Sequence, residues 1–162
     1  MKRIKIVISA LLLLITLSAC TSDIESETHD SIFQVGVDEL KNVKANEAFE
    51  IIGYLKNKSK RTLEVSHGSG MFTYEIYNED GDQILPNTTI FIRNDIGYMV
   101  ELKADEEYRN NGEGQRSKEY YEFVIHEPGY YKVKMHVEFS INNEGKQEQI
   151  NISSDLKEFK VE

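Results

Sequence analysis

A strict alternation of apolar and polar residues over positions 130–141 constrains the fold more than any other feature of the chain. A period of two is typical of a β-strand with one buried and one exposed face, because successive side chains point to opposite sides. Such a strand needs a second layer to cover its apolar face. The expected inward residues are Tyr131, Val133, Met135, Val137 and Phe139, and the expected outward residues are Lys132, Lys134, His136, Glu138 and Ser140.

Other short segments from residue 31 onward are also typical of strands. Asp80-Gly81 is a hairpin-turn sequence, and residues 143–145 form a second turn signal. Helix is indicated only at residues 37–44 and 103–108. We therefore predict an all-β fold, an immunoglobulin-like antiparallel β-sandwich of seven to nine strands. The further strand segments are expected at residues 34–37, 49–55, 63–65, 72–77, 83–85, 98–102, 120–125, 147–152 and 159–161.

A local motif at the start of the alternating strand supports this fold class. The motif is Glu127-Pro128-Gly129-Tyr130-Tyr131. A Pro-Gly turn followed by Tyr is typical of the tyrosine corner of immunoglobulin-like sandwiches, where the phenol hydrogen-bonds to nearby backbone. Alternation also predicts that only one of the two tyrosines is buried. We expect a structural role for this pair.

The first 20 residues have the layout of an export signal. Lys2, Arg3 and Lys5 form a positive start, and residues 6–17 form a largely apolar run that is followed by two small residues. This order is that of a secretory signal peptide. The apolar run is shorter than the roughly 20 residues that a transmembrane helix needs, so we do not expect a permanent membrane span.

Leu17-Ser18-Ala19-Cys20 ends this signal. The motif resembles the lipobox of bacterial lipoproteins. The resemblance implies cleavage between Ala19 and Cys20, a diacylglycerol on the Cys20 thiol and an acylated amino terminus. Two or more acyl chains hold a protein at a membrane, whereas one chain holds it only marginally.

The predicted organisation places one domain at the outer face of the cell membrane. Residues 1–19 are expected to be the signal peptide, 20–30 the lipidated cysteine with a flexible acidic tether, and 31–162 the β-sandwich domain. The chain also loosely resembles small lipoproteins of Gram-positive bacteria, which have similar leaders and sandwich domains. That resemblance implies location and no particular chemistry.

The charge of the chain limits the classes of partner it can bind, and its cysteine content limits how the domain can be stabilised. The chain has 19 basic and 28 acidic residues, and its leader holds three of the basic ones, so the mature part carries a formal net charge of −12. Nucleic acid is an unsuitable partner, because binding it requires Lys and Arg to neutralise phosphates. Cys20 is the only cysteine. The domain therefore contains no intramolecular disulfide and must be stabilised by its core.

Several short motifs follow one another between residues 49 and 141. They are Asn57-Lys58-Ser59, a Ser-Gly-containing segment at 66–70, Phe72-Thr73-Tyr74-Glu75-Ile76, Asp80-Gly81, and Pro128-Gly129-Tyr130-Tyr131-Lys132-Val133. Their order resembles the intracellular proteinase inhibitor family of Gram-positive bacteria, which has an immunoglobulin-like sandwich. Ile84-Leu85-Pro86-Asn87 stands where that family carries a Trp-containing segment. The resemblance implies an inhibitory loop, which we would place at residues 84–94.

The sequence offers little catalytic or metal-binding chemistry. His67-Gly68-Ser69-Gly70 is the segment nearest to a nucleophile motif, and we interpret it as a loop at an end of the sandwich. The histidines at 29, 67, 126 and 136 lack the paired spacing of a zinc site. Residues 78–82, from Asn78 to Asp82, carry oxygen ligands suited to calcium, but a plain hairpin turn is the favoured interpretation. We expect no catalytic residue, no metal ligand and no cofactor.

The leading hypothesis is a non-enzymatic binding module that is held at the membrane through Cys20. Its loops would contact a protein, a peptide or a cell-wall ligand. The alternatives are an outward-facing proteinase inhibitor and a metal-binding or hydrolytic surface protein. The ligand and the oligomeric state stay open. The candidate ligand-binding residues are His67, Ser69, Tyr108, Asn110 and Tyr120.

Overall fold

The computed structural model describes residues 32–85, 97–109, 118–143 and 145–162. These residues form one short helix, α3 (Lys118–Tyr121), and otherwise strands and turns. The predicted all-β class is confirmed. The strands are β1 (Phe33–Val37), β2 (Ala48–Glu50), β3 (Gly53–Asn57), β4 (Leu63–His67), β5 (Phe72–Tyr77), β6 (Gln83–Ile84), β7 (Tyr98–Leu102), β8 (Glu107–Tyr108), β9 (Glu122–Val124), β10 (Gly129–Asn143), β11 (Lys146–Ser153) and β12 (Lys157–Val161).

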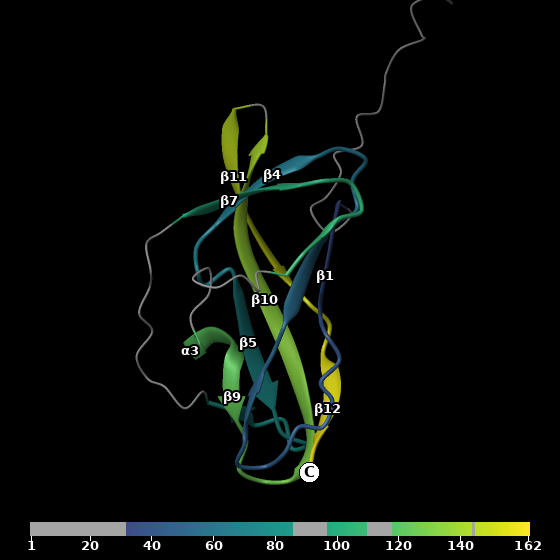
Figure 1. The fold of residues 1–162 in the computed structure, drawn as a ribbon, viewed down its shortest axis with the longest axis vertical. Helices are drawn as coiled ribbons and strands as arrows, with labels where there is room; N and C mark the ends of the chain where they lie inside the picture. The colour runs from purple at the N-terminus through teal and green to yellow at the C-terminus, as the bar shows by residue number, and fades with distance from the viewer. Residues whose placement is uncertain (1–31, 86–96, 110–117, 144) are drawn as a thin grey trace, which may run out of the picture.

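The strands are arranged as two layers of an immunoglobulin-like sandwich (Figure 1). One layer has the order β1-β3-β8, and β2, which runs directly before β3, pairs with β9. The other layer has the order β6-β5-β10-β4-β7, with β11 and β12 also paired to β10. All pairings between these strands are antiparallel. The described chain has twelve strand segments rather than seven to nine, because short breaks divide longer runs such as β2 and β3.

Strand β10 is the backbone of the larger layer. Its odd-numbered residues from Tyr131 to Ile141 are buried and its even-numbered residues are not, as the alternation predicts. Along one edge it pairs with β5 and then β4, and along the other with β12 and then β11. The strand is longer than any single partner, so each of its edges is covered by two strands in succession.

A β-bulge at Ser154 joins β11 to β12. Val133 pairs with Lys157, and His136 pairs with Ser153. Three steps along β10 therefore correspond to four steps along the opposite chain. The Ser154 N–H donates to Met135 O (2.9 Å), and the Met135 N–H donates to Ser154 Oγ (2.9 Å), so the bulge leaves no gap in the ladder. The extra residue switches the inward positions from even numbers in β11 to odd numbers in β12.

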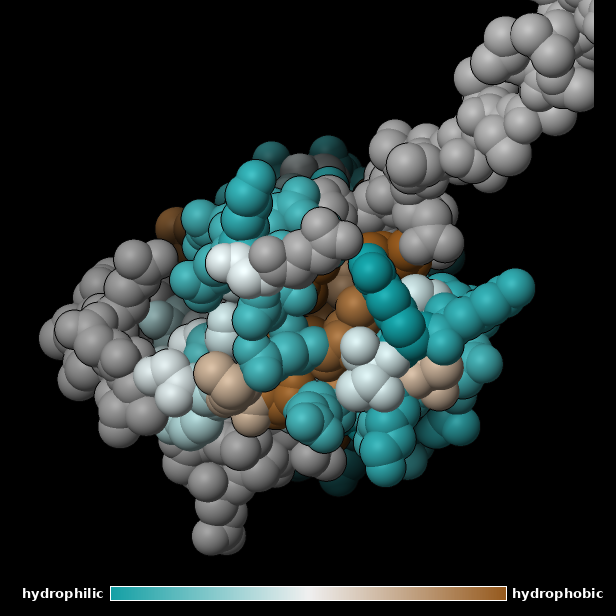
Figure 2. All heavy atoms as spheres, turned by 90° about the horizontal axis from the view of Figure 1, so that it is seen from above, coloured by the Kyte–Doolittle hydropathy of each residue, from teal (hydrophilic) through white to brown (hydrophobic). Residues whose placement is uncertain are grey.

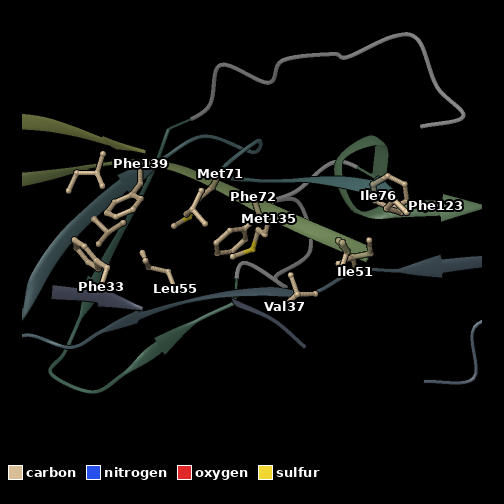
Figure 3. Packing of buried hydrophobic residues seen from close by; sticks show 14 of the residues in the cluster. Phe33, Val37, Ile51, Leu55, Met71, Phe72, Ile76, Phe123, Met135 and Phe139 are labelled. Atoms are coloured by element: carbon tan, nitrogen blue, oxygen red, sulfur yellow. The ribbon is translucent and has the colours of Figure 1, made fainter. Parts of the chain in front are cut away.

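The core lies between the two layers. Figure 3 shows Phe33 and Leu55 of one layer pointing towards Phe139 and Met71 of the other. The rings of Phe33 and Phe139 meet edge to face with centroids 4.9 Å apart, and Leu55 is fully buried. Seen from the end where β4, β7 and β11 lie, hydrophobic residues are visible deep between hydrophilic ones (Figure 2).

The predicted tyrosine corner is confirmed. The Tyr131 hydroxyl donates to the Glu127 carbonyl oxygen (2.9 Å), and Tyr131 is 6% exposed whereas Tyr130 is 60% exposed. The predicted hairpin turn after β5 is present as well. There the Asn78 side-chain oxygen accepts the Asp82 N–H (2.7 Å), and Gly81 adopts a positive φ of 87°. One of the oxygen atoms that a calcium ion would need is therefore used by the turn itself.

The two predicted helices are wrong. Residues 37–44 contain the end of β1 and a loop in which Asn42 has a φ of 55°, and residues 103–108 contain a turn in which Asp105 has a φ of 61°. A left-handed residue ends a right-handed helix, so neither segment can be continuously helical. Within the described residues, no helix has the length and apolar character to cross a membrane.

Buried Asn57 connects two of the chain crossings between the layers, β3 to β4 and β7 to β8. Its Nδ2 donates to the carbonyl oxygens of Arg61 (2.7 Å) and Leu102 (2.9 Å), and its Oδ1 accepts from the backbone N–H (2.9 Å) and hydroxyl (2.6 Å) of Ser59. Its main chain also pairs with the turn at residues 103–106. A fully buried amide with every group satisfied fixes the β3–β4 turn against the β7–β8 turn.

Replacing Asn57 by Ala should lower the free energy of unfolding by about 3 kcal/mol, because several buried polar groups lose their partner. Urea denaturation followed by circular dichroism measures this change. The matched control is Asn143→Ala at the exposed end of β10, which should change stability by less than about 0.5 kcal/mol. A loss at position 57 no larger than that of the control would contradict the proposed role of the amide.

Candidate functional site

A second interruption along β10 creates the most distinctive surface of the domain. Val137 pairs with Phe72, and Ser140 pairs with Ser66. Three steps along β10 therefore correspond to six steps along the opposite chain. The surplus is taken up by residues 67–71, here called the 67–71 bulge. Met71 O accepts the Glu138 N–H (2.9 Å), and the Met71 N–H donates to Gly68 O (3.2 Å). Our placement of this segment at an end of the sandwich is wrong, since it lies beside the middle of a sheet strand.

His67 and Tyr108 form a hydrogen-bonded pair at the base of this bulge. His67 Nδ1 lies 2.8 Å from Gly68 O, and His67 Nε2 lies 2.8 Å from the Tyr108 hydroxyl. Because a carbonyl oxygen can only accept, Nδ1 carries the proton and the neutral ring accepts the Tyr108 O–H at Nε2. The imidazole also stacks on Tyr98 with ring centroids 5.5 Å apart.

Burial sets the protonation state of the pair. It lowers the pKa of His67, and the hydrogen bond to the Gly68 carbonyl opposes this only in part. Burial, with a smaller effect of Tyr98, raises the pKa of Tyr108 to about 12. Both groups are therefore neutral at pH 7, and both nitrogens of the imidazole are already engaged. The pair is suited to holding the base of the bulge and poorly suited to proton transfer or metal binding.

A hollow of about 760 Å³ lies on the outer face of the larger layer beside the bulge. Its floor is formed by outward residues of β10 and β11 with Ser66 and Thr73 beside them, and its walls by the 67–71 bulge, Gly97 and Tyr120. We call it the β10–β11 groove. The polar residues from the sheet face are Ser66, Thr73, His136, Glu138, Ser140, Gln147, Gln149 and Asn151.

Cross-strand hydrogen bonds order part of the groove floor. Gln149 Nε2 donates to Glu138 Oε1 (2.6 Å), and Gln147 Nε2 donates to Ser66 Oγ (3.4 Å). At one end, His136 Nδ1 lies 2.8 Å from Ser153 Oγ, while its Nε2 lies 3.0 Å from Glu75 Oε2. These contacts hold long side chains in place before any ligand arrives, which reduces the entropy lost on binding.

Four of the five predicted ligand-binding residues lie at this region. His67 and Tyr108 form the base, Ser69 lines the groove, and Tyr120 lies across the bulge, where a Cβ at Gly70 would be 3.3 Å from its ring. Whether they touch a ligand stays a prediction. Asn110 lies outside the described residues, as do the Cys20 lipidation site and the Ala19–Cys20 cleavage site.

The amide-bearing residues of β11 were missed by sequence reasoning. Gln147, Gln149 and Asn151 look like ordinary exposed positions of an edge strand. Only the pairing of β11 with β10 and the bulge on the opposite edge bring them to the same hollow as Ser66 and Thr73. The one local signal was their spacing of two, which places them on one face of the strand.

Metal ligands do not gather in the described part of the chain, where no group of three or more His, Cys, Asp or Glu is suitably placed. Met71 and Met135, which lie near histidines in the sequence, are core residues that are 1% and 0% exposed. Met99, by contrast, is 68% exposed.

Comparison with known proteins identifies no family. No family model and no curated protein matches the chain. The solved structures that resemble it include three with TM-scores of 0.36 or lower. A CARDB domain from Pyrococcus furiosus, solved with di-metal ions, has 13% identity and a TM-score of 0.36, over 80% of this chain and 86% of that one. PapD-like domain 7 of human CEP192 has 12% identity and a TM-score of 0.35, over 76% and 82%.

The third structure is a β-glucuronidase from Bacteroides uniformis, with 15% identity and a TM-score of 0.30 over 76% of this chain. The match covers 13% of the enzyme's chain. These TM-scores are too low to carry an argument about function. The fold class rests on the strand pairing described above.

The buried His67 should make stability depend on pH. Its folded pKa lies below its ordinary value of 6.5, so the unfolded chain binds a proton first as the pH falls. The free energy of unfolding should therefore fall as the pH drops below 6.5, by at most about 1.4 kcal/mol per pH unit for this single group. Urea titrations between pH 7.5 and 5 measure the slope.

Two variants separate the titration of His67 from its packing. His67→Gln should abolish the slope, whereas Tyr108→Phe should lower stability and keep it, because the imidazole stays buried. Glu75 contributes to the pH dependence of the free energy of unfolding in a lower pH range. Hydrogen bonds from Tyr77 and His136 lower its pKa below 4.5, so its contribution is lost only in more acidic solution. An unchanged slope in His67→Gln would show that another group is responsible.

Proposed function

We propose that the protein is a lipid-anchored binding module at the outer face of the cell membrane. The observation that carries the proposal is the β10–β11 groove, a hollow whose polar side chains are partly held in place by hydrogen bonds. It lies on the outer face of the larger sheet, whose inner face already packs against the smaller layer. The leader and Cys20 support the location. The tether expected at residues 20–30 would keep the domain clear of the lipid headgroups.

Binding fits the groove better than catalysis does. The histidine nearest to the bulge is held by Tyr108 and Gly68, and Ser69 is 4% exposed, so neither is arranged as a base with an accessible nucleophile. Apart from His136 and Glu138, the polar side chains of the floor are amides and hydroxyls, which recognise a ligand by hydrogen bonding. These features support a non-enzymatic role.

An outward-facing proteinase inhibitor is retained as the alternative to the binding module. Its predicted loop at residues 84–94 is described only at Ile84 and Leu85, where Leu85 is 74% exposed. No other feature of the described residues favours inhibition over binding at the groove.

Changing Cys20 to Ser should release the protein from the membrane. The serine hydroxyl cannot receive the thioether-linked diacylglycerol, and the apolar run of the leader is short for a permanent membrane span. Detergent-phase partitioning of expressing cells, with intact mass of the purified product, measures the change. Wild type should enter the detergent phase with a lipid mass increment, and the variant should stay aqueous. Equal partitioning of both without that increment would refute lipidation.

Blocking the groove should abolish ligand capture. We expect immobilised full-length protein in detergent to retain a component of wall, membrane or secreted fractions. Ser140→Arg, which places a long side chain on the groove floor, should lose that component. Gln34→Arg, at the exposed position of β1, is the matched control and should keep it. Capture that is the same in both variants, or none by wild type, would overturn the groove as a binding site.

A further inference from the structure

We propose that the ligand of the β10–β11 groove is a neutral carbohydrate. The inference rests on the proposed binding function and adds the chemical class of the ligand. It follows from three properties of the groove: the regular array of hydrogen-bonding groups on its floor, the shortage of charge, and the burial of its large apolar residues Met71 and Phe139.

The floor is a grid of short polar side chains set by strand register. Ser140 is flanked by Ser66 on β4 and Gln149 on β11, and Glu138 lies opposite Asn151. Outward residues repeat about every 7 Å along a strand, and neighbouring strands are about 4.8 Å apart. Donors and acceptors therefore recur at sugar-sized intervals on a rigid support, as recognition of several ring hydroxyls requires.

Several groups of this grid are available to a ligand. Within the described residues, the side chains of Thr73, Ser140 and Asn151 make no hydrogen bond to another protein group, and all three line the groove. Gln149 Nε2 fixes Glu138 through one carboxylate oxygen. Hydroxyls and amides both donate and accept, which matches the hydroxyl groups of a sugar better than it matches an acceptor-only or donor-only ligand.

The charge of the groove disfavours anionic ligands. No Lys or Arg is among the described residues that line it, and Glu138 is its carboxylate. The chain as a whole has a formal net charge of −9. A phosphate-bearing or uronic-acid polymer would meet repulsion from Glu138 and no Lys or Arg partner. A neutral polyol avoids both penalties.

The groove also lacks what a protein partner needs. Interfaces between proteins depend on a few large apolar or aromatic residues at their centre. The exposed large hydrophobic residues of the described chain, Leu85, Met99, Tyr130 and Leu156, all lie outside the groove lining. Tyr120 contributes one ring at the wall, against Gly70. Phe139, Met71 and His67 also line the groove but are 2%, 1% and 6% exposed, so Tyr120 is its more accessible ring. One accessible aromatic ring beside a polar floor suits the mixed polar and C–H surface of a sugar.

The test is calorimetric titration of the full-length protein in detergent with defined tetrasaccharides. Chitotetraose and maltotetraose are the neutral ligands, and tetragalacturonic acid is the anionic comparison. We expect saturable binding of at least one neutral sugar and none of the acid. The double variant Gln149→Ala/Asn151→Ala should weaken binding about tenfold, as expected for the loss of two hydrogen bonds. The matched control Gln34→Ala on β1 should leave it unchanged.

The outcomes separate this inference from the function on which it rests. No binding of either neutral sugar at millimolar concentration, with capture from cell fractions still abolished by Ser140→Arg, would overturn the carbohydrate and keep the binding module, leaving a peptide or protein as ligand. Tighter binding of the acid would also overturn it. Loss of both sugar binding and groove-dependent capture would refute the two proposals together.

Discussion

The hydrogen-bond pairing of β10 on both of its edges determines the form of this domain. Strands β4, β5, β11 and β12 pair with it directly, and β6 and β7 join through β5 and β4. No partner is long enough to follow its full length, so both edges contain a break. One break is the single-residue bulge at Ser154, and the other is the larger 67–71 bulge. The first preserves the sheet, and the second raises a wall beside its outer face.

The wall is held by groups that take no charge at neutral pH. His67 is stabilised as the neutral tautomer by Gly68 and Tyr108, and burial opposes its protonation. A charged imidazole at this place would have attracted anions to the groove. The buried pair therefore adds no positive charge to the groove, and the hydrogen-bonding groups of β10 and β11 determine its chemistry.

Local patterns predicted the local structure of this chain well. The alternation in residues 130–141, the tyrosine corner at Glu127 and Tyr131, and the turn at Asn78 each depend on residues a few positions apart. The two expected helices failed for a non-local reason. The segment at 103–108 is fixed by its backbone bonds to Asn57, and Val43 is held by a bridge to Val161 at the other end of the chain. Tertiary pairing outweighed a weak helical preference.

The groove could be predicted only in part, because it depends on register. His67, Ser69 and Tyr120 were predicted as candidate ligand-binding residues, whereas Gln149 and Asn151 had only their spacing of two as a local signal. The size of a bulge decides which residues of two edges face each other across β10, and a shift of one residue turns every side chain to the other face. The alternating sequence of a strand does not predict where the neighbouring strands break their pairing with it.

The Asn57 amide has a consequence for the order of folding. Its Nδ2 acceptors are the carbonyls of Arg61 and Leu102, which are 4 and 45 residues away along the chain. The β3–β4 turn can form early, but the second bond requires closure of a long loop, which is entropically slow. We expect this corner to be incomplete in the transition state, so that substitutions at Asn57 accelerate unfolding more than they slow folding, as stopped-flow kinetics would measure. Asn57 would then secure the finished sandwich kinetically, without directing its assembly.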